Sequence, residues 1–75
     1  MNLTLYTRTD CCLCLEAGAL MEGAGIAYTP VNIEADLTLI QRFGDLIPVV
    51  ENPRTGDTLS WPFDVNRLRV LINDQ

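Results

Sequence analysis

Three cysteines lie within four positions of this chain, at Cys11, Cys12 and Cys14. Cys11 and Cys14 have the C-x-x-C spacing, and a polar turn joins them to the apolar stretch 3–7. The residues after the turn have the pattern of a helix. Unpaired N–H groups and a partial positive charge at a helix N-terminus stabilise a thiolate over a thiol, and the thiolate is the nucleophile of sulfur chemistry. A C-x-x-C beside a β-α-β pattern is typical of a redox site.

Position along the predicted helix suggests a role for each cysteine. Cys11 is the expected nucleophile, because a helix N-terminus lowers a cysteine pKa from about 8.5 into the range of roughly 3.5–7.5. Arg8 adds positive charge nearby, whereas the carboxylate of Asp10 disfavours a thiolate unless Asp10 faces away and caps the helix. Cys14 is the expected resolving thiol, since it lies one turn after Cys11. The alternative for Cys11 is a small, half-buried apolar residue without a chemical role, and the alternative for Cys14 is an ordinary buried helix residue.

Cys12 has two open interpretations. On a helix it points roughly 100° away from Cys11, so it is either a partly exposed filler or a second resolving or regulatory thiol.

Composition narrows the classes of function. The chain has 75 residues, which indicates one domain over residues 1–75. Its net charge is −5, with ten acidic residues against five arginines. Binding to phosphates normally needs clustered Lys and Arg, so neither nucleic acid nor an anionic membrane is an expected partner. The chain has no histidine, which excludes Cys–His pairs and histidine metal ligands. No secretory signal or membrane-length apolar run is visible, so we expect a soluble cytoplasmic protein.

Strand and helix patterns alternate along the chain. Strands are predicted at residues 2–7, 26–33, 47–50 and 58–61. A first helix is predicted at residues 11–23, a short second helix starts within residues 34–36 and stops at Gly44, and a third helix follows residue 64. A right-handed crossover makes the first two strands parallel, and the turn at 52–57 makes the last two a hairpin. The sequence therefore predicts an α/β fold, β-α-β-α-β-β-α, with a mixed four-stranded sheet flanked by three helices. The first helix would begin at the carboxyl end of the first strand, where open α/β sheets place their sites.

Apolar spacing predicts the buried face of each helix, and acidic residues predict two caps. The expected faces are Leu13, Ala17, Leu20, Met21 and Ala24 in the first helix, Leu37, Ile40 and Phe43 in the second, and Val65, Leu68, Leu71 and Ile72 in the third. Asp36 and Asp64 are the expected N-caps. Proline cannot donate to a strand ladder, so Pro30 predicts that the second strand is an edge strand or that position 30 faces away from its partner strand.

Four features together resemble the glutaredoxins of the thioredoxin superfamily. Tyr6-Thr7-Arg8 ahead of the C-x-x-C is similar to the family's strand, basic residue and active cysteines. Ile47-Pro48-Val49 is similar to the proline that the family holds in cis, facing those cysteines. The element order and the run Trp61-Pro62-Phe63-Asp64 before the last helix complete a resemblance that spans the whole chain.

The resemblance implies a thioredoxin-like fold and a thiol–disulfide oxidoreductase, a glutaredoxin-like disulfide reductase. It implies a monomer with no bound metal or cofactor. The expected substrates are disulfide-containing proteins or small thiols, and the expected electron donor is glutathione, as a co-substrate, or a thioredoxin-type reductase.

The expected substrate-binding residues are Arg8, Ile47, Pro48 and Trp61. A cis bond before Pro48 would leave the backbone N–H and C=O of Ile47 free to pair with a substrate segment. Trp61 and Phe63 either form a flat apolar wall for a peptide or belong to the core, which is the commoner place for aromatic residues in so small a domain. Arg42 would either reach an anionic ligand or complement the helix dipole.

Two departures from the family pattern bear on the electron donor. Cys12-Leu13 stands between the cysteines where members usually have Pro-Tyr or Gly-Pro. Trp61-Pro62 stands where glutathione-using members carry a Gly-Gly pair, which lets a ligand approach the backbone closely. We therefore expect weak coupling to glutathione. Trp61 is more similar to the glutaredoxin-shaped redoxins that serve ribonucleotide reductase and take electrons from thioredoxin reductase.

Two other functions stay open at this stage. The thiols would hold a soft metal or an iron–sulfur cluster only with help from a second chain or from glutathione, because one C-x-x-C supplies too few ligands. Alternatively, the chain is a redox-silent interaction domain, since a fold by itself does not establish activity.

Overall fold

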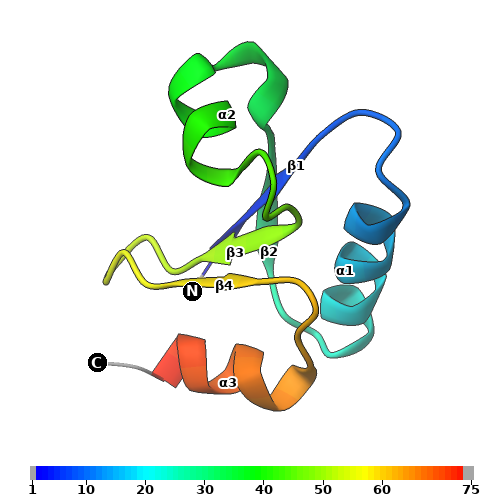
Figure 1. Ribbon diagram of the computed structural model, residues 1–75. Helices are drawn as coiled ribbons and strands as arrows, with labels where there is room; N and C mark the ends of the chain where they lie inside the picture. The colour runs from blue at the N-terminus through cyan, green and yellow to red at the C-terminus, as the bar shows by residue number, and fades with distance from the viewer. Residues whose placement is uncertain (1, 74–75) are drawn as a thin grey trace.

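The computed structural model describes residues 2–73, and it has the predicted element order (Figure 1). In chain order the elements are β1 (Leu3–Thr7), α1 (Cys12–Gly23), β2 (Tyr28–Asn32), the 3₁₀ helix η1 (Ile33–Ala35), α2 (Leu37–Phe43), β3 (Val49–Glu51), β4 (Thr58–Ser60) and α3 (Val65–Asn73). The β-α-β-α-β-β-α prediction is confirmed, and η1 is an addition to it.

The four strands form one mixed sheet in the order β2-β1-β3-β4. β1 is parallel to β2 and antiparallel to β3, and β3 and β4 form the predicted hairpin. β2, which carries Pro30, is an edge strand as expected, and β4 is the other edge. The carboxyl end of central strand β1 leads into α1, as predicted.

Two hydrophobic clusters cover the two faces of the sheet. Strand alternation directs neighbouring side chains to opposite faces, so Leu5 and Val50 belong to one cluster and Tyr6 and Val49 to the other. The first cluster is completed by residues of α1 and α3, among them Ala17, Met21, Leu68 and Leu71. The second is completed by Ile33 of η1 and Phe43 of α2. Accordingly α2 lies well apart from α1 and α3 (Figure 1).

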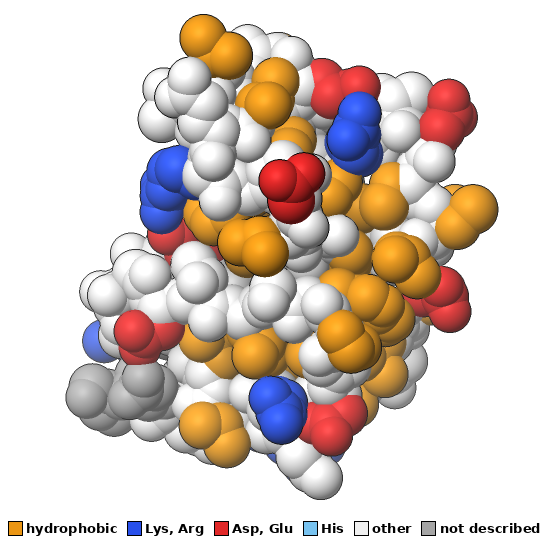
Figure 2. Space-filling model, viewed as in Figure 1, with side chains coloured by type: hydrophobic (Ala, Val, Ile, Leu, Met, Phe, Trp, Pro, Cys, Tyr) orange, Lys and Arg blue, Asp and Glu red, His pale blue; other side chains and the backbone are white. Residues whose placement is uncertain are grey.

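The predicted helix faces are only partly correct. Leu13 of α1 is 46% exposed, while the buried residues of that helix are Cys14, Ala17, Gly18 and Met21. Leu37 and Ile40 of α2 are also exposed, and Phe43 is the buried residue of this seven-residue helix. Hydrophobic side chains are accordingly visible on the molecular surface between scattered charged groups (Figure 2).

Two predicted caps are confirmed. The Asp36 carboxylate accepts a hydrogen bond from the N–H of Thr38 at 2.9 Å, and the Asp64 carboxylate accepts one from the N–H of Arg67 at 2.9 Å. Each cap satisfies an otherwise unpaired N–H of the first turn, and so fixes where α2 and α3 begin. Over residues 2–73, none of the helices has the length and apolar character of a transmembrane span.

Candidate active site

Cys11 lies at the junction of the turn after β1 and the start of α1. It is the N-cap of α1, with extended backbone angles of φ −103° and ψ 104°. Its Sγ accepts a hydrogen bond from the N–H of Cys14 at 3.1 Å. Asp10 does not take the capping position, because it lies one residue earlier, with a left-handed φ of 59°. The sulfur itself therefore accepts from an electropositive N–H of the first helical turn.

Cys11 and Cys14 form a disulfide, with their Cα atoms 5.2 Å apart. The two sulfurs differ in accessibility, because Cys11 is half-buried whereas Cys14 is only 6% exposed. Cys12, the first residue of α1, is a free and exposed cysteine. A molecule that approaches from solvent therefore meets Cys11 or Cys12 before Cys14.

The turn that carries Cys11 is held in place by the segment after β2. The N–H of Thr9 donates to Glu34 Oε1 at 2.9 Å, and the hydroxyl of Thr9 accepts a bond from Asn32 at 3.3 Å. Hydrogen bonds from Thr9 hold the pKa of the exposed Glu34 carboxyl below its ordinary value, and Arg8 adds a smaller electrostatic effect. Glu34 and Asn32 were not predicted as part of the site. They lie more than twenty residues from Thr9, and no local sequence pattern indicates their contacts with it.

A groove of about 560 Å³ lies beside the disulfide, between α1 and the β1–β2 side of the sheet. All three cysteines line it, and so does Arg8. Farther along, the hydroxyl of Tyr28 donates to Glu22 at 2.7 Å, and this bond raises the pKa of Tyr28. The structure thus brings the predicted basic residue Arg8 to the same groove as the predicted nucleophile.

The other three predicted substrate-binding residues do not line this groove. The Ile47–Pro48 peptide bond is cis, as is Trp61–Pro62. Pro48 is fully buried, and its carbonyl oxygen accepts a hydrogen bond from the N–H of Trp61 at 3.0 Å. Trp61 is half-buried against the first core cluster, with its ring edge-on to Phe63 at 5.0 Å.

The expectation that the N–H of Ile47 is free for a substrate is wrong. This group donates to the carbonyl oxygen of Phe43 at 3.1 Å, because the chain leaving α2 continues as a hydrogen-bonded turn. Within residues 2–73, no hydrogen bond is found to the carbonyl oxygen of Ile47. Only the carbonyl therefore keeps the predicted ability to pair with a substrate segment.

Arg8 also borders a second groove, of about 580 Å³, together with Arg42, Asp45 and Leu46. The guanidinium of Arg42 lies 4.6 Å from the ring centre of Phe43, which is a cation–π distance. Phe43 in turn stacks on Tyr6 with ring centres 4.6 Å apart. The aromatic stack thus places Arg42 beside the same groove as Arg8, where the two cations can meet an anionic group.

Metal ligation was the main alternative role for the thiols. Within the described part of the chain, no group of three or more His, Cys, Asp or Glu residues is arranged to hold a metal ion.

The chain was compared with known protein families and structures. The family model "Glutaredoxin-like domain (DUF836)" matches residues 2–73. The glutaredoxin-like protein NrdH of Salmonella typhimurium is 38% identical over 77 aligned positions, which cover 91% of this chain and 89% of that protein. The X-ray structure of protein XcR50 from X. campestris is 39% identical, with a TM-score of 0.84 and 97% of each chain covered.

A more distant structure supports the fold alone. The thioredoxin-like protein BC3987, solved as a point mutant, is 20% identical with a TM-score of 0.67, over 95% of this chain and 99% of that one. The fold is therefore thioredoxin-like, and within this fold the C-x-x-C pair lies at the start of α1. Together with the match over residues 2–73, this shows that the chain belongs to the glutaredoxin-like family.

Proposed function

We propose that this protein is a thiol–disulfide oxidoreductase in which Cys11 is the nucleophile and Cys14 the resolving thiol. The main support is the difference between the two sulfurs. Cys11 is half-buried and caps α1 through its sulfur, while its disulfide partner Cys14 is almost fully buried. Electron-poor N–H groups at a helix start favour a thiolate at Cys11, and burial keeps Cys14 from attacking substrates directly.

The reaction then has two exchange steps. In the reduced protein, the Cys11 thiolate attacks one sulfur of a substrate disulfide, which forms a mixed disulfide and releases the other substrate sulfur as a thiolate. The Cys14 thiolate then attacks Cys11, which forms the disulfide seen in the structure and releases the second substrate thiol. Two electrons pass from the protein to the substrate, and the released thiolates take up protons from solvent.

We propose that substrates enter beside Arg8, in the groove that the cysteines line. Because Ile47 lies outside that groove, its carbonyl would accept a hydrogen bond only from a substrate segment that extends beyond the groove. Disulfide-containing proteins and small disulfides both fit an open groove of this kind. We also propose a thioredoxin-type reductase as the electron donor, because Trp61-Pro62 occupies the place of the Gly-Gly pair of glutathione-using relatives.

Three single substitutions test the roles of the cysteines. Cys11→Ser should abolish reduction of insulin or a small disulfide, whereas Cys14→Ser should trap mixed disulfides through Cys11. Cys12→Ser is the matched control, because it removes a neighbouring thiol that is not in the disulfide, and it should keep most of the activity. Full activity of Cys11→Ser would contradict the proposal, and loss of activity in Cys12→Ser would assign a resolving role to Cys12.

The electron donor needs a separate assay. Turnover should be measured side by side with glutathione plus its reductase and with a thioredoxin-type reductase. We expect the second system to support the faster turnover. Robust glutathione-dependent turnover would contradict the donor assignment and leave the roles of Cys11 and Cys14 unaffected.

A further inference from the structure

The two edges of the sheet differ in their ability to pair with another strand. β2 carries Pro30, which lacks an N–H and so makes that edge less able to pair with another strand. β4 consists of Thr58, Leu59 and Ser60, with neither a proline nor a charge. An exposed edge of this kind is a template for pairing with another chain.

The hydrogen bonds of the β3–β4 hairpin show which groups of β4 face outward. The N–H of Trp61 donates to Pro48 at 3.0 Å, and the N–H of Asn52 donates to Asp57 at 2.9 Å, so these positions face β3. Alternation along an antiparallel strand then directs the N–H and C=O groups of Thr58 and Ser60 away from β3. The open edge of β4 therefore offers two donors and two acceptors.

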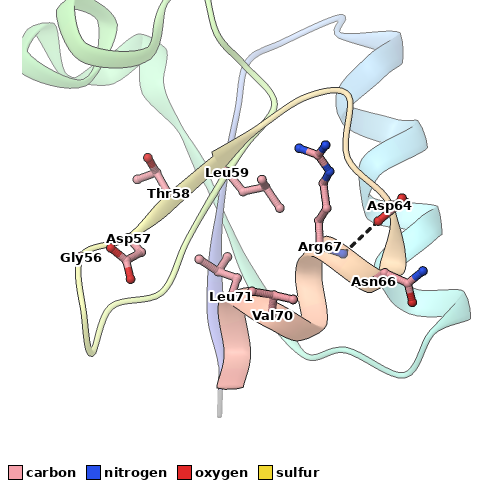
Figure 3. A pocket seen from close by; sticks show the side chains of 9 residues that line it. All are labelled: Gly56, Asp57, Thr58, Leu59, Asp64, Asn66, Arg67, Val70 and Leu71. Atoms are coloured by element: carbon pink, nitrogen blue, oxygen red, sulfur yellow. Dashed lines mark hydrogen bonds between the residues drawn. The ribbon is translucent and has the colours of Figure 1, made fainter. Parts of the chain in front are cut away.

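A groove of about 800 Å³ runs beside this edge, between β4 and α3 (Figure 3). Its apolar lining comes from Leu59, Val70 and Leu71, and Val70 is 69% exposed. The buried Asn52 donates from its side chain to the carbonyl oxygen of Leu71 at 3.0 Å, which ties the hairpin to α3. The groove is therefore already formed in the single chain.

The charges of the groove lie at opposite ends. Asp57 lies at the hairpin end, whereas Arg67 and Asp64 lie at the start of α3 (Figure 3). The Asp64 carboxylate caps α3 by accepting the backbone N–H of Arg67 at 2.9 Å, so the positive end of the helix dipole offsets part of its charge. The side chain of Arg67 extends away from Asp64 in this view, which leaves its guanidinium as the cation of that end.

We propose that the β4 edge and its groove bind a second copy of this chain. A two-fold axis at Leu59 would place Thr58 of each copy opposite Ser60 of the other and would join the two sheets into one. The same axis places Asp57 of each copy at the Arg67 end of the other copy. The carboxylate of one groove therefore faces the guanidinium of the other at both ends of the interface. Leu59 and Val70 of both copies would share the apolar seam.

This inference is independent of the proposed redox function. The β4 groove and the cysteine groove share no lining residue, so pairing leaves the disulfide open. Interfaces built on one short strand are small and weak, so we expect a dissociation constant of roughly 0.1–1 mM. The chain would therefore stay the expected monomer at low concentration.

Sedimentation velocity from roughly 10 µM to 1 mM tests the proposal. A Cys12→Ser background excludes disulfide cross-links between copies. Asp57→Arg and Arg67→Asp should each raise the dissociation constant by roughly 2- to 30-fold, because each removes two exposed ion pairs. The double variant, Asp57→Arg with Arg67→Asp, should restore association. Arg69→Asp is the matched control, since Arg69 lies on α3 outside the groove and the substitution makes the same change in net charge as Arg67→Asp.

Restoration in the double variant would support the two-fold pairing directly. Asp57→Arg brings the net charge of the chain closer to zero, so weaker association of this variant cannot come from overall repulsion. A wild-type chain that stays monomeric at about 1 mM would overturn the proposal. So would a double variant that is folded by circular dichroism and associates no better than the single variants.

Discussion

Reduction of the Cys11–Cys14 disulfide should lower the stability of the fold by an amount set by the size of the ring that it closes. The two residues are three positions apart, so the ring spans only four residues. The chain-entropy relation for a ring of this size corresponds to about 2 kcal/mol at 25 °C. For a domain of this length, such a loss lowers the melting temperature by about 8–15 °C.

A thiolate at Cys11 would offset part of this loss in a pH-dependent way. If the pKa of Cys11 is lower in the folded protein than in the unfolded chain, ionisation stabilises the folded form. This contribution is fully present above the unfolded pKa of about 8.5, and it is lost as the pH falls through the folded pKa. For a folded pKa of about 7, it is about 1 kcal/mol at about pH 8.

Urea denaturation followed by circular dichroism measures both effects. The oxidised protein, the reduced protein and reduced Cys11→Ser should be compared at about pH 5 and at about pH 8. The serine of that variant would be a favourable N-cap without a thiolate, and the variant keeps Cys14, so the contribution of Cys14 cancels in the comparison. We expect the free energy of unfolding of the reduced wild type to increase relative to that of reduced Cys11→Ser as the pH rises. An equal difference at both pH values, or no loss on reduction at about pH 5, would refute the reasoning.

Three further substitutions test hydrogen bonds and core packing in the fold. Tyr6→Phe should cost about 1–3 kcal/mol in urea denaturation, because Tyr6 donates to Glu51 at 2.6 Å. Burial and this bond raise the pKa of Tyr6 from 10.0 to about 12, so its contribution to stability should be full below pH 10 and be lost as the pH rises through about 12. Glu34→Gln should increase hydrogen exchange at the N–H of Thr9, which donates to Glu34 in the wild type. Because the pKa of Glu34 is lowered, its carboxylate stabilises the wild-type fold until the pH falls below the ordinary glutamate range, and the variant should lack this pH-dependent stability. Leu68→Ala, at a fully buried position, should cost about 2–5 kcal/mol by thermal melting.

Local patterns in the sequence predicted the strands, the helix caps and the hairpin of the last two strands, because each depends on neighbouring residues. Asp36 and Asp64 each act on an N–H two or three positions ahead, so their role is visible in a short window. Pro30 favoured an edge strand for the same reason, and β2 is an edge strand. The C-x-x-C pair likewise needed only four consecutive residues.

The wrong predictions and the missed contact all depend on the whole fold. α1 has apolar residues on more than one side, so its spacing fitted a stripe through Leu13 as well as the buried face through Cys14. The link between Thr9 and Glu34 joins segments 25 residues apart. The N–H of Ile47 was assigned to a substrate because nothing in the sequence shows that the turn after α2 reaches back to Phe43.

Titration of the reduced protein tests the central claim most directly. The claim is that the start of α1 holds Cys11 as a thiolate near neutral pH. Thiolate absorbance in the ultraviolet, recorded against pH in a Cys12→Ser background, should show a transition clearly below about 8.5 that Cys11→Ser removes. A transition at or above about 8.5, or one that persists in Cys11→Ser, would contradict the account.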